Sequence, residues 1–267
     1  MILAASAAGL LLGTRGPVDL RLLGWTLLGT ALAAGGTLAL NQVLERDVDA
    51  RMERTRERPL ASGRMGPTAA LVLGASLCAL GLVLLGLKAN PLSAAVTAAI
   101  PASYLFLYTP MKRTSAMNTL WGGIPGALPP MAGWAAARGT LDRGAWILFA
   151  ILFLWQIPHA LAIGWRHRED YARAGIRLLS TVAPDGGSMA RQVLLNSLAL
   201  LAAGLLPALT GMAGPGYFVA ALALGLVFLA FGVHLALART TEAARRLVLC
   251  SLAYLPALFL AMVLDRR

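Results

Sequence analysis

The sequence predicts an all-α integral membrane protein, a bundle of about nine transmembrane helices. Of its 267 residues, 58% are hydrophobic and only 13% are charged, and the mean hydropathy is +0.71. A soluble domain carries about 25% charged residues, and a single core could not bury this much apolar surface. The apolar residues also form uninterrupted stretches rich in Leu, Ala and Gly, unlike the ~10-residue alternating segments of a membrane β-barrel.

Eight stretches are long enough to cross a bilayer as helices, which takes roughly 17–25 mostly apolar residues. In chain order they are approximately residues 22–42, 66–87, 91–109, 119–137, 145–165, 189–211, 215–237 and 246–264. The apolar segment 1–13 is too short to span alone, and we interpret it as the end of a truncated first span. A cleaved signal peptide is the alternative, but no Lys or Arg precedes this apolar run. Residues 1–267 are expected to form one transmembrane domain.

Positive charge gathers in alternate loops. With segment 1–13 counted as the first span, the loops after spans 2, 4, 6 and 8 hold sixteen of the 23 Lys and Arg residues. Such loops stay in the cytoplasm, so we expect a multi-pass protein of the cytoplasmic (inner) membrane, surrounded by the lipid bilayer. The net charge of +11 is then mostly topology, and no nucleic-acid partner is needed. Two of these loops, 43–65 and 166–188, are long, and any chemistry is expected at this face.

Three oxygen-bearing side chains are spaced as one helical column at the start of the first long loop. Asn41, Glu45 and Asp49 follow one another at intervals of four residues, which places them within about 80° on an α-helix. Carboxylates stacked at the end of an apolar span need something to offset their repulsion. Hard oxygen ligands of this kind bind Mg²⁺ that also coordinates a phosphate substrate. An exposed helix end with internal salt bridges explains the same pattern equally well.

Basic residues near this column could bind phosphate oxygens. Arg54 and Arg58 follow it and offer forked donors. Lys112 and Arg113 form a basic pair after another span, where they could clamp a diphosphate or simply mark the cytoplasmic membrane face.

The basic pair lies between Tyr108 and Asn118, and a span rich in glycine and proline follows. Small residues allow close helix packing, while prolines interrupt backbone hydrogen bonds where a helix lines a cavity. This part of the chain therefore predicts either a cleft for a bulky ligand or tight packing.

A third stretch places aromatic and titratable side chains near one helical face. These residues are Trp155, His159, His167, Asp170 and Tyr171. A histidine inside the membrane, such as His159, costs free energy if its ring nitrogens have no partner. It could therefore ligate heme iron, accept a proton, or form a hydrogen bond to a neighbouring helix. His167 and Asp170 could bind a second Mg²⁺ or position the first.

Taken together, these motifs resemble the UbiA superfamily of membrane prenyltransferases, and within it the protoheme IX farnesyltransferase (heme O synthase) branch. The resemblance covers essentially the whole chain. It rests on the segments NQVLERDVD, RTRERPL, YTPMKRTSAMN, GGIPGALPPMAGW, WQIPH and DYARAG, which occur in this order.

This resemblance implies nine helices around a central cavity, with Mg²⁺-diphosphate at its cytoplasmic mouth. It implies that the farnesyl group of farnesyl diphosphate moves to a vinyl carbon of heme b (protoheme IX), giving heme O for heme–copper oxidases. Its protein partners would be heme A synthase or oxidase assembly proteins. Asn41, Glu45 and Asp49, with Asp170 as a further ligand, would hold the metal. The cations Arg54, Arg58, Lys112 and Arg113 would aid the leaving diphosphate, and the remaining candidates would border the acceptor.

The sequence departs from the superfamily pattern at two places. Carboxylates of a second Asp-rich motif stand where this chain has His167 and Tyr171, with Asp170 displaced, a departure that the heme branch shares. The basic Lys-Pro-Arg segment that usually opens the first span is absent from the sequence. Two alternatives remain open: a UbiA-type enzyme that prenylates an aromatic quinone precursor, and a multi-span transporter.

Overall fold

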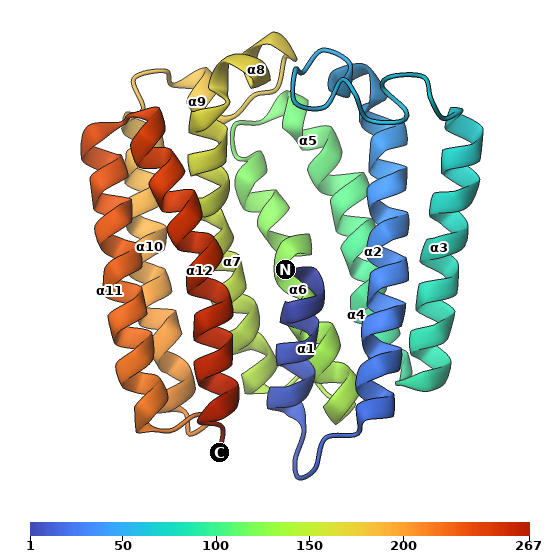
Figure 1. The fold of residues 1–267 in the computed structure, drawn as a ribbon, viewed down its shortest axis with the longest axis vertical. Coiled ribbons are helices and arrows are strands. Elements are labelled where there is room, and N and C mark those ends of the chain that lie inside the picture. The colour runs from blue at the N-terminus through green and yellow to red at the C-terminus, as the bar shows by residue number, and fades with distance from the viewer.

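The computed structural model describes all residues, 1–267, and consists of upright helices joined by loops (Figure 1). In chain order the elements are α1 (Ile2–Gly13), α2 (Leu20–Asp49), α3 (Pro67–Lys88), α4 (Pro91–Ala102), the π-helical turn η1 (Ser103–Tyr108), α5 (Thr109–Thr114), α6 (Asn118–Arg138), α7 (Arg143–Arg166), α8 (Arg168–Arg173), α9 (Leu179–Val182), α10 (Gly187–Leu209), α11 (Pro215–Ala238) and α12 (Thr241–Leu264).

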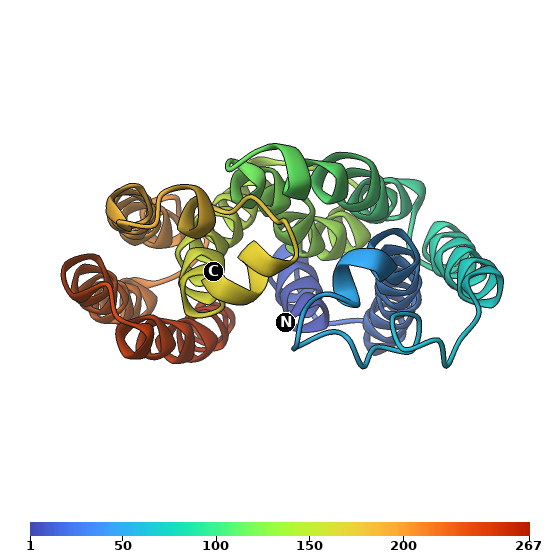
Figure 2. The same ribbon diagram turned by 90° about the horizontal axis from the view of Figure 1, so that it is seen from above.

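Seven helices are long and apolar enough to cross a membrane, with the continuous run Pro91–Thr114 counted as one. Helix α6 and the shorter α1 stand among them, which completes the predicted bundle of about nine helices (Figures 1 and 2). The predicted spans match these helices closely, with one informative difference. The span expected to end near residue 42 continues as α2 to Asp49, so the column of oxygen ligands lies on regular helix.

Local sequence signals begin the helices where the structure has them. The Asp19 side chain accepts hydrogen bonds from two backbone N–H groups at the start of α2, and the Asn90 side chain accepts one at the start of α4. Pro67, Pro91 and Pro215 occupy first-turn positions, where the missing N–H costs nothing.

Glycine allows two pairs of helices to pack in close contact. A Cβ atom at Gly133 on α6 would collide with the carbonyl oxygen of Ser6 on α1, and one at Gly36 on α2 would meet the backbone of Gly74 on α3. Small residues at such crossings are how membrane helices associate without a hydrophobic driving force. The three prolines inside α6 do not break it, because the helix runs unbroken from Asn118 to Arg138.

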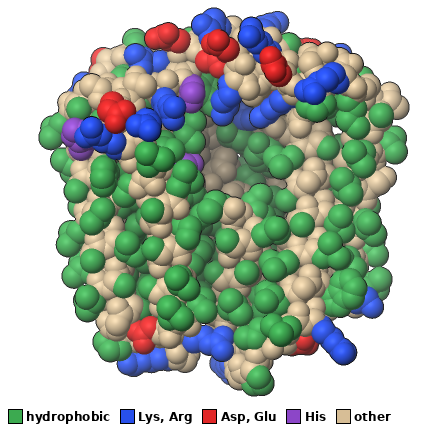
Figure 3. Space-filling model, viewed as in Figure 1, with side chains coloured by type: hydrophobic (Ala, Val, Ile, Leu, Met, Phe, Trp, Pro, Cys, Tyr) green, Lys and Arg blue, Asp and Glu red, His purple; other side chains and the backbone are tan.

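The loops with most of the Lys and Arg residues lie at the same end of the bundle, at the top of Figure 1, as the charge pattern predicts. Charged side chains gather there in the space-filling view, while hydrophobic side chains cover the walls (Figure 3). Viewed from this end, α8 and the segment after α2 lie over the helices (Figure 2).

Candidate active site

A cavity of about 550 Å³ lies inside the bundle, below the charged end. Half of its 34 lining residues are hydrophobic, and the charged ones all belong to the end of α2, the loop that follows it and α5. A cavity with a charged mouth and apolar walls suits a ligand that has an anionic head and a hydrocarbon tail.

The predicted ligand column faces this cavity. Asn41, Glu45 and Asp49 all line it and are only 4%, 8% and 4% exposed, whereas the side chain of Asp47 is 70% exposed. Residues four apart share a helix face, so the three oxygen-bearing side chains stack above one another. The alternative of an exposed, internally paired helix end therefore does not describe the column.

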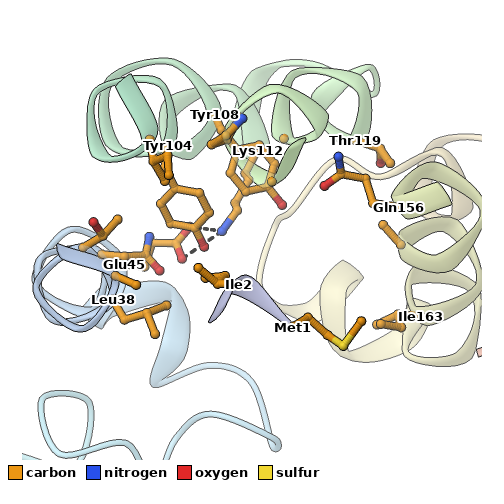
Figure 4. A pocket seen from close by; sticks show the side chains of 18 of the residues that line it. Met1, Ile2, Leu38, Glu45, Tyr104, Tyr108, Lys112, Thr119, Gln156 and Ile163 are labelled. Carbon is orange, nitrogen blue, oxygen red and sulfur yellow. Dashed lines mark hydrogen bonds and ion pairs between the residues drawn. The ribbon is translucent and has the colours of Figure 1, made fainter. Parts of the chain in front are cut away.

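Each carboxylate of the column is paired with a cation from another segment. Lys112 Nζ on α5 lies 2.8 and 3.0 Å from the two oxygens of Glu45 (Figure 4). Arg58 Nη1, from the loop after α2, lies 3.0 and 2.9 Å from the two oxygens of Asp49. Buried carboxylates are stable only when paired in this way. The same two cations line the cavity, where they can reach an incoming anion.

A π-helical turn shapes the wall that faces the column. Ser103–Tyr108 forms this turn, and Thr109 Oγ1 donates a 2.8 Å hydrogen bond to the carbonyl oxygen of Tyr104. Both tyrosine rings lie against the ammonium of Lys112, whose Nζ is 5.6 Å from the centre of the Tyr104 ring and 4.6 Å from that of Tyr108 (Figure 4). Cation–π contacts of this kind hold the lysine over the cavity mouth.

The donor set of the column fits Mg²⁺. Asn41 donates its amide N–H to Thr109 Oγ1 at 3.3 Å, which leaves the amide oxygen available as a ligand. Two carboxylates and one amide are fewer than the six oxygens of an octahedral Mg²⁺ site, so phosphate oxygens and water would complete it. No group of three or more His, Cys, Asp or Glu side chains could bind a metal by itself. The column is therefore suited to a metal that arrives with its substrate.

Two loops meet above the cavity and hold each other in place. Asp170 Oδ1 on α8 accepts the backbone N–H of Glu53 at 2.9 Å and also binds Arg173 Nη2 at 2.9 Å. Arg54 Nη2 donates to the Tyr171 hydroxyl at 3.1 Å. A small apolar cluster joins the same segments, formed by Val48, Met52, Ala174 and Ile176.

The surroundings of Asp170 and His167 shift the pKa values of both residues. Burial alone would raise the pKa of Asp170, but the N–H of Glu53 and the guanidinium of Arg173 outweigh it and hold that pKa below its ordinary value of 3.8. Burial, together with the positive charges of Arg54 and Arg166, lowers the pKa of His167 below its ordinary 6.5. At neutral pH Asp170 is therefore an anion and His167 adds no charge to the mouth.

The family model described as the UbiA prenyltransferase family matches residues 2–262. The chain belongs to the UbiA prenyltransferase family. It is 52% identical to the protoheme IX farnesyltransferase of Solibacter usitatus, over 93% of this chain and 85% of that protein. The enzymes of the same name from Salinibacter ruber and Myxococcus xanthus are both 43% identical, over 99% and 100% of this chain and 94% and 90% of theirs. The expected likeness to the heme branch is confirmed.

Solved structures show the same fold. A structure of digeranylgeranylglyceryl phosphate synthase in membranes superposes with a TM-score of 0.82 at 17% identity, over 99% of this chain and 92% of that one. A UbiA homolog from Aeropyrum pernix gives 0.77 at 19% identity, over 98% and 95%. A UbiA homolog from Archaeoglobus fulgidus, bound to DMAPP and Mg²⁺, gives 0.68 at 15% identity, over 98% and 94%. These structures confirm the UbiA-type bundle. The family match and the named relatives replace the transporter alternative with a prenyltransferase enzyme.

Most of the residues predicted for this UbiA-family site do meet at the cavity. Those that line it are Asn41, Glu45, Asp49, Arg54, Arg58, Tyr108, Lys112, Trp155, His159 and Tyr171.

Four predicted residues do not line the cavity. The Arg113 side chain is exposed, and that of Asn118 is fully buried because its amide donates to the carbonyl oxygens of Ser115 and Arg177. His167 caps the end of α7, and Asp170 is occupied in joining the two loops. Their contacts place them in the loops at the charged end of the bundle, around the site rather than in it.

Several residues that line or support the cavity were not predicted from the sequence. Tyr104 shares the lysine contact with Tyr108, and Gln156 on α7 lines the cavity while donating to the carbonyl oxygen of Gly123 at 2.6 Å. Thr109 supports Asn41 from outside the lining. Tyr104 lies four residues before Tyr108, a spacing that could have found the first of these.

Proposed function

We propose that this chain transfers the farnesyl group of farnesyl diphosphate to a vinyl carbon of heme b, giving heme O. The observation that carries the proposal is the buried column of Asn41, Glu45 and Asp49, with its paired cations, at the mouth of an apolar cavity. The high identity to relatives named protoheme IX farnesyltransferase supports heme as the acceptor.

The column residues would bind Mg²⁺ together with the diphosphate, as the charge and hardness of their oxygens favour. Bound Mg²⁺ would neutralise the charge that develops on the leaving diphosphate. Lys112 and Arg58 would then turn from Glu45 and Asp49 to the phosphate oxygens, because the metal would replace them as partners of these carboxylates. The farnesyl chain would lie along the apolar walls, away from bulk water.

In the reaction, the allylic C1–O bond breaks and the diphosphate leaves with the bonding electrons. The terminal carbon of a heme vinyl group attacks the allylic cation and forms the new C–C bond. Water then adds to the cation left on the other vinyl carbon and loses a proton, which gives the hydroxyethylfarnesyl group. The apolar walls of the cavity would keep water from capturing the allylic cation earlier.

The topology supports the location of this reaction. The positively charged end of the bundle, which holds the mouth, would face the cytoplasm. We take residues 1–267 as one prenyltransferase unit in the cytoplasmic (inner) membrane. Heme O would leave for heme A synthase or for oxidase assembly proteins.

The direct test incubates purified protein in detergent with heme b, farnesyl diphosphate and Mg²⁺, with an EDTA control, and separates the hemes by mass. A Mg²⁺-dependent gain in mass that matches heme O is the expected result. If a folded preparation gives no such product, but prenylates an aromatic quinone precursor under the same conditions, the acceptor assignment is wrong.

A further inference from the structure

His159 lies in the wall of the cavity with its imidazole ring held from two sides. The ring stacks on Trp155, with ring centres 4.9 Å apart and planes 16° from parallel. Its Nδ1 atom is 2.6 Å from the hydroxyl oxygen of Ser251 on α12. The indole N–H of Trp155 donates to the carbonyl oxygen of the same Ser251 at 2.9 Å. Helix α12 therefore fixes both the ring and the residue on which it stacks.

The hydroxyl of Ser251 decides which nitrogen of His159 carries the proton. Ser251 is fully buried, and its Oγ is also 2.6 Å from the carbonyl oxygen of Val248. A carbonyl oxygen only accepts, so we assign the single hydroxyl proton to the Val248 contact. Ser251 Oγ is then left as an acceptor, and the bond to His159 requires the proton to be on Nδ1.

The other nitrogen of His159, Nε2, is therefore unprotonated. It makes no hydrogen bond to the protein, and His159 lines the cavity. A histidine that binds a metal through one nitrogen almost always donates the other N–H to a fixed acceptor, which sets the tautomer and the orientation of the ring. His159 has this arrangement.

The position of α7 in the cavity fits such a role. Glu45 and Leu38 on α2 stand on one wall, and Gln156 and Ile163 on α7 stand on the opposite one (Figure 4). His159 lies between these two positions on α7. A planar ligand anchored on the α7 wall would therefore extend toward the carboxylates of α2.

We propose that Nε2 of His159 binds the iron of a metalloporphyrin acceptor, and that Ser251 is the positioning residue that keeps Nε2 free of its proton. This inference rests on the proposed function, since it requires a heme acceptor. It places the iron of the acceptor next to α7. The reacting vinyl edge of the porphyrin then faces α2, where the diphosphate is proposed to bind. No bond of the protein or the porphyrin would break, because Nε2 would only donate its lone pair to the iron.

The test is a titration of purified protein in detergent with heme b, followed by visible absorption. Wild-type protein should give a Soret band typical of histidine-ligated heme. His159→Ala should lose that band, and added imidazole should restore it by occupying the vacated position. His234→Ala is the matched control, because His234 on α11 is exposed and outside the cavity, and it should bind heme as the wild type does.

Ser251→Ala tests the positioning role. Loss of a partner that fixes a metal-binding histidine typically costs about 10–100-fold in metal affinity, so heme affinity should fall by that factor while the band keeps its histidine-ligated form. If this variant does not fold, the imidazole rescue of His159→Ala still decides the question of ligation.

Other outcomes would overturn the inference. A His159→Ala protein with an unchanged spectrum and heme affinity shows that the iron is not bound there. If that variant also lost turnover, His159 would act as a base instead. If wild-type protein makes heme O but shows no absorption spectrum of histidine-ligated heme, the proposed iron ligation is wrong and the proposed function stands. Protein that neither binds nor farnesylates heme would remove both.

Discussion

Lys112 and Glu45 form a partly buried ion pair across the cavity mouth, with Nζ 2.8 and 3.0 Å from the two carboxylate oxygens. The pair joins α5 to α2, and both residues line the cavity. Without a ligand, the lysine balances a charge that burial would otherwise penalise. If a metal took the carboxylate, as proposed, the same ammonium would become available to a diphosphate.

Replacing Lys112 should therefore weaken binding of the prenyl diphosphate. Hydrogen bonds to charged groups contribute about 1.5–3 kcal/mol, so Lys112→Met should raise the KM for farnesyl diphosphate about 10- to 100-fold. Steady-state kinetics at saturating Mg²⁺ measures this. Arg113→Gln is the comparison, because Arg113 is adjacent in sequence but exposed and outside the lining. Equal effects of the two changes would place Arg113 at the diphosphate as well.

Asp49 should be indispensable for turnover, while Asp47 should not. Asp49→Asn removes one charge from the column of Asn41, Glu45 and Asp49, the proposed Mg²⁺ site, and turnover should fall about 100-fold or more, as when a preorganised electrostatic contact is lost. Asp47→Asn, two residues away on the exposed face of the same helix, should retain activity. Activity in detergent is compared at matched thermal stability. Wild-type turnover by Asp49→Asn would show that another face of α2 holds the metal.

Asp170 provides a test between a metal ligand and a residue that joins the loops. If it joins the loops, Asp170→Asn should free the segment after α2, and trypsin should cut at its arginines several times faster. The Mg²⁺ concentration for half-maximal activity should then change little. Glu169→Gln, an exposed neighbour, serves as control. A higher Mg²⁺ requirement with unchanged proteolysis would instead support Asp170 as the predicted metal ligand.

The same contact has a predictable pH dependence. The pKa of Asp170 is lowered in the folded protein, so its stabilising contribution is fully present above the ordinary value of 3.8 and is lost as the pH falls through the lower, folded value. Hydrogen exchange of the Glu53 amide, measured from pH 6 downward, should therefore accelerate only in the acid range, beyond its intrinsic pH dependence. Loss of protection near neutral pH would mean that another group holds this loop.

Packing of α1 on α6 should depend on Gly133. Gly133→Ala places a methyl group against the backbone of Ser6, and overpacking of this kind typically costs about 1–3 kcal/mol. The melting temperature in detergent should fall accordingly. Gly35→Ala on α2 is the control, since a Cβ there meets open space. Equal melting temperatures for the two variants would show that α1 can shift without cost.

Hydropathy and spacing predicted most of the fold and much of the site, for physical reasons that particular residues illustrate. The spans follow from apolar length alone, and the column of Asn41, Glu45 and Asp49 follows from helical periodicity, which needs no tertiary information. The lining position of Trp155 and His159 was also predicted, because both lie on one face of α7.

Residues whose position depends on packing between distant segments were less predictable. The sequence around Asn118 predicts a cavity residue. Its side-chain amide instead donates a hydrogen bond to the carbonyl oxygen of Arg177, in the loop before α9. Ser251 gave no signal, since a serine in an apolar span usually bonds only its own helix. Its contact with His159 exists because α12 packs on α7, ninety-two residues away.

The π-helical turn at Ser103–Tyr108 sets the rotational phase of everything that follows it in the same span. In an unbroken α-helix, Tyr104 and Lys112 would be about 80° apart around the axis, because eight residues advance 100° each. A π-turn accommodates one extra residue, which brings the two side chains to within about 20° of one line. Straightening the turn would rotate Lys112 by about 100° and carry its ammonium away from Glu45. The wider backbone of the π-turn thus determines that Lys112 is the residue of this span that pairs with Glu45 on α2.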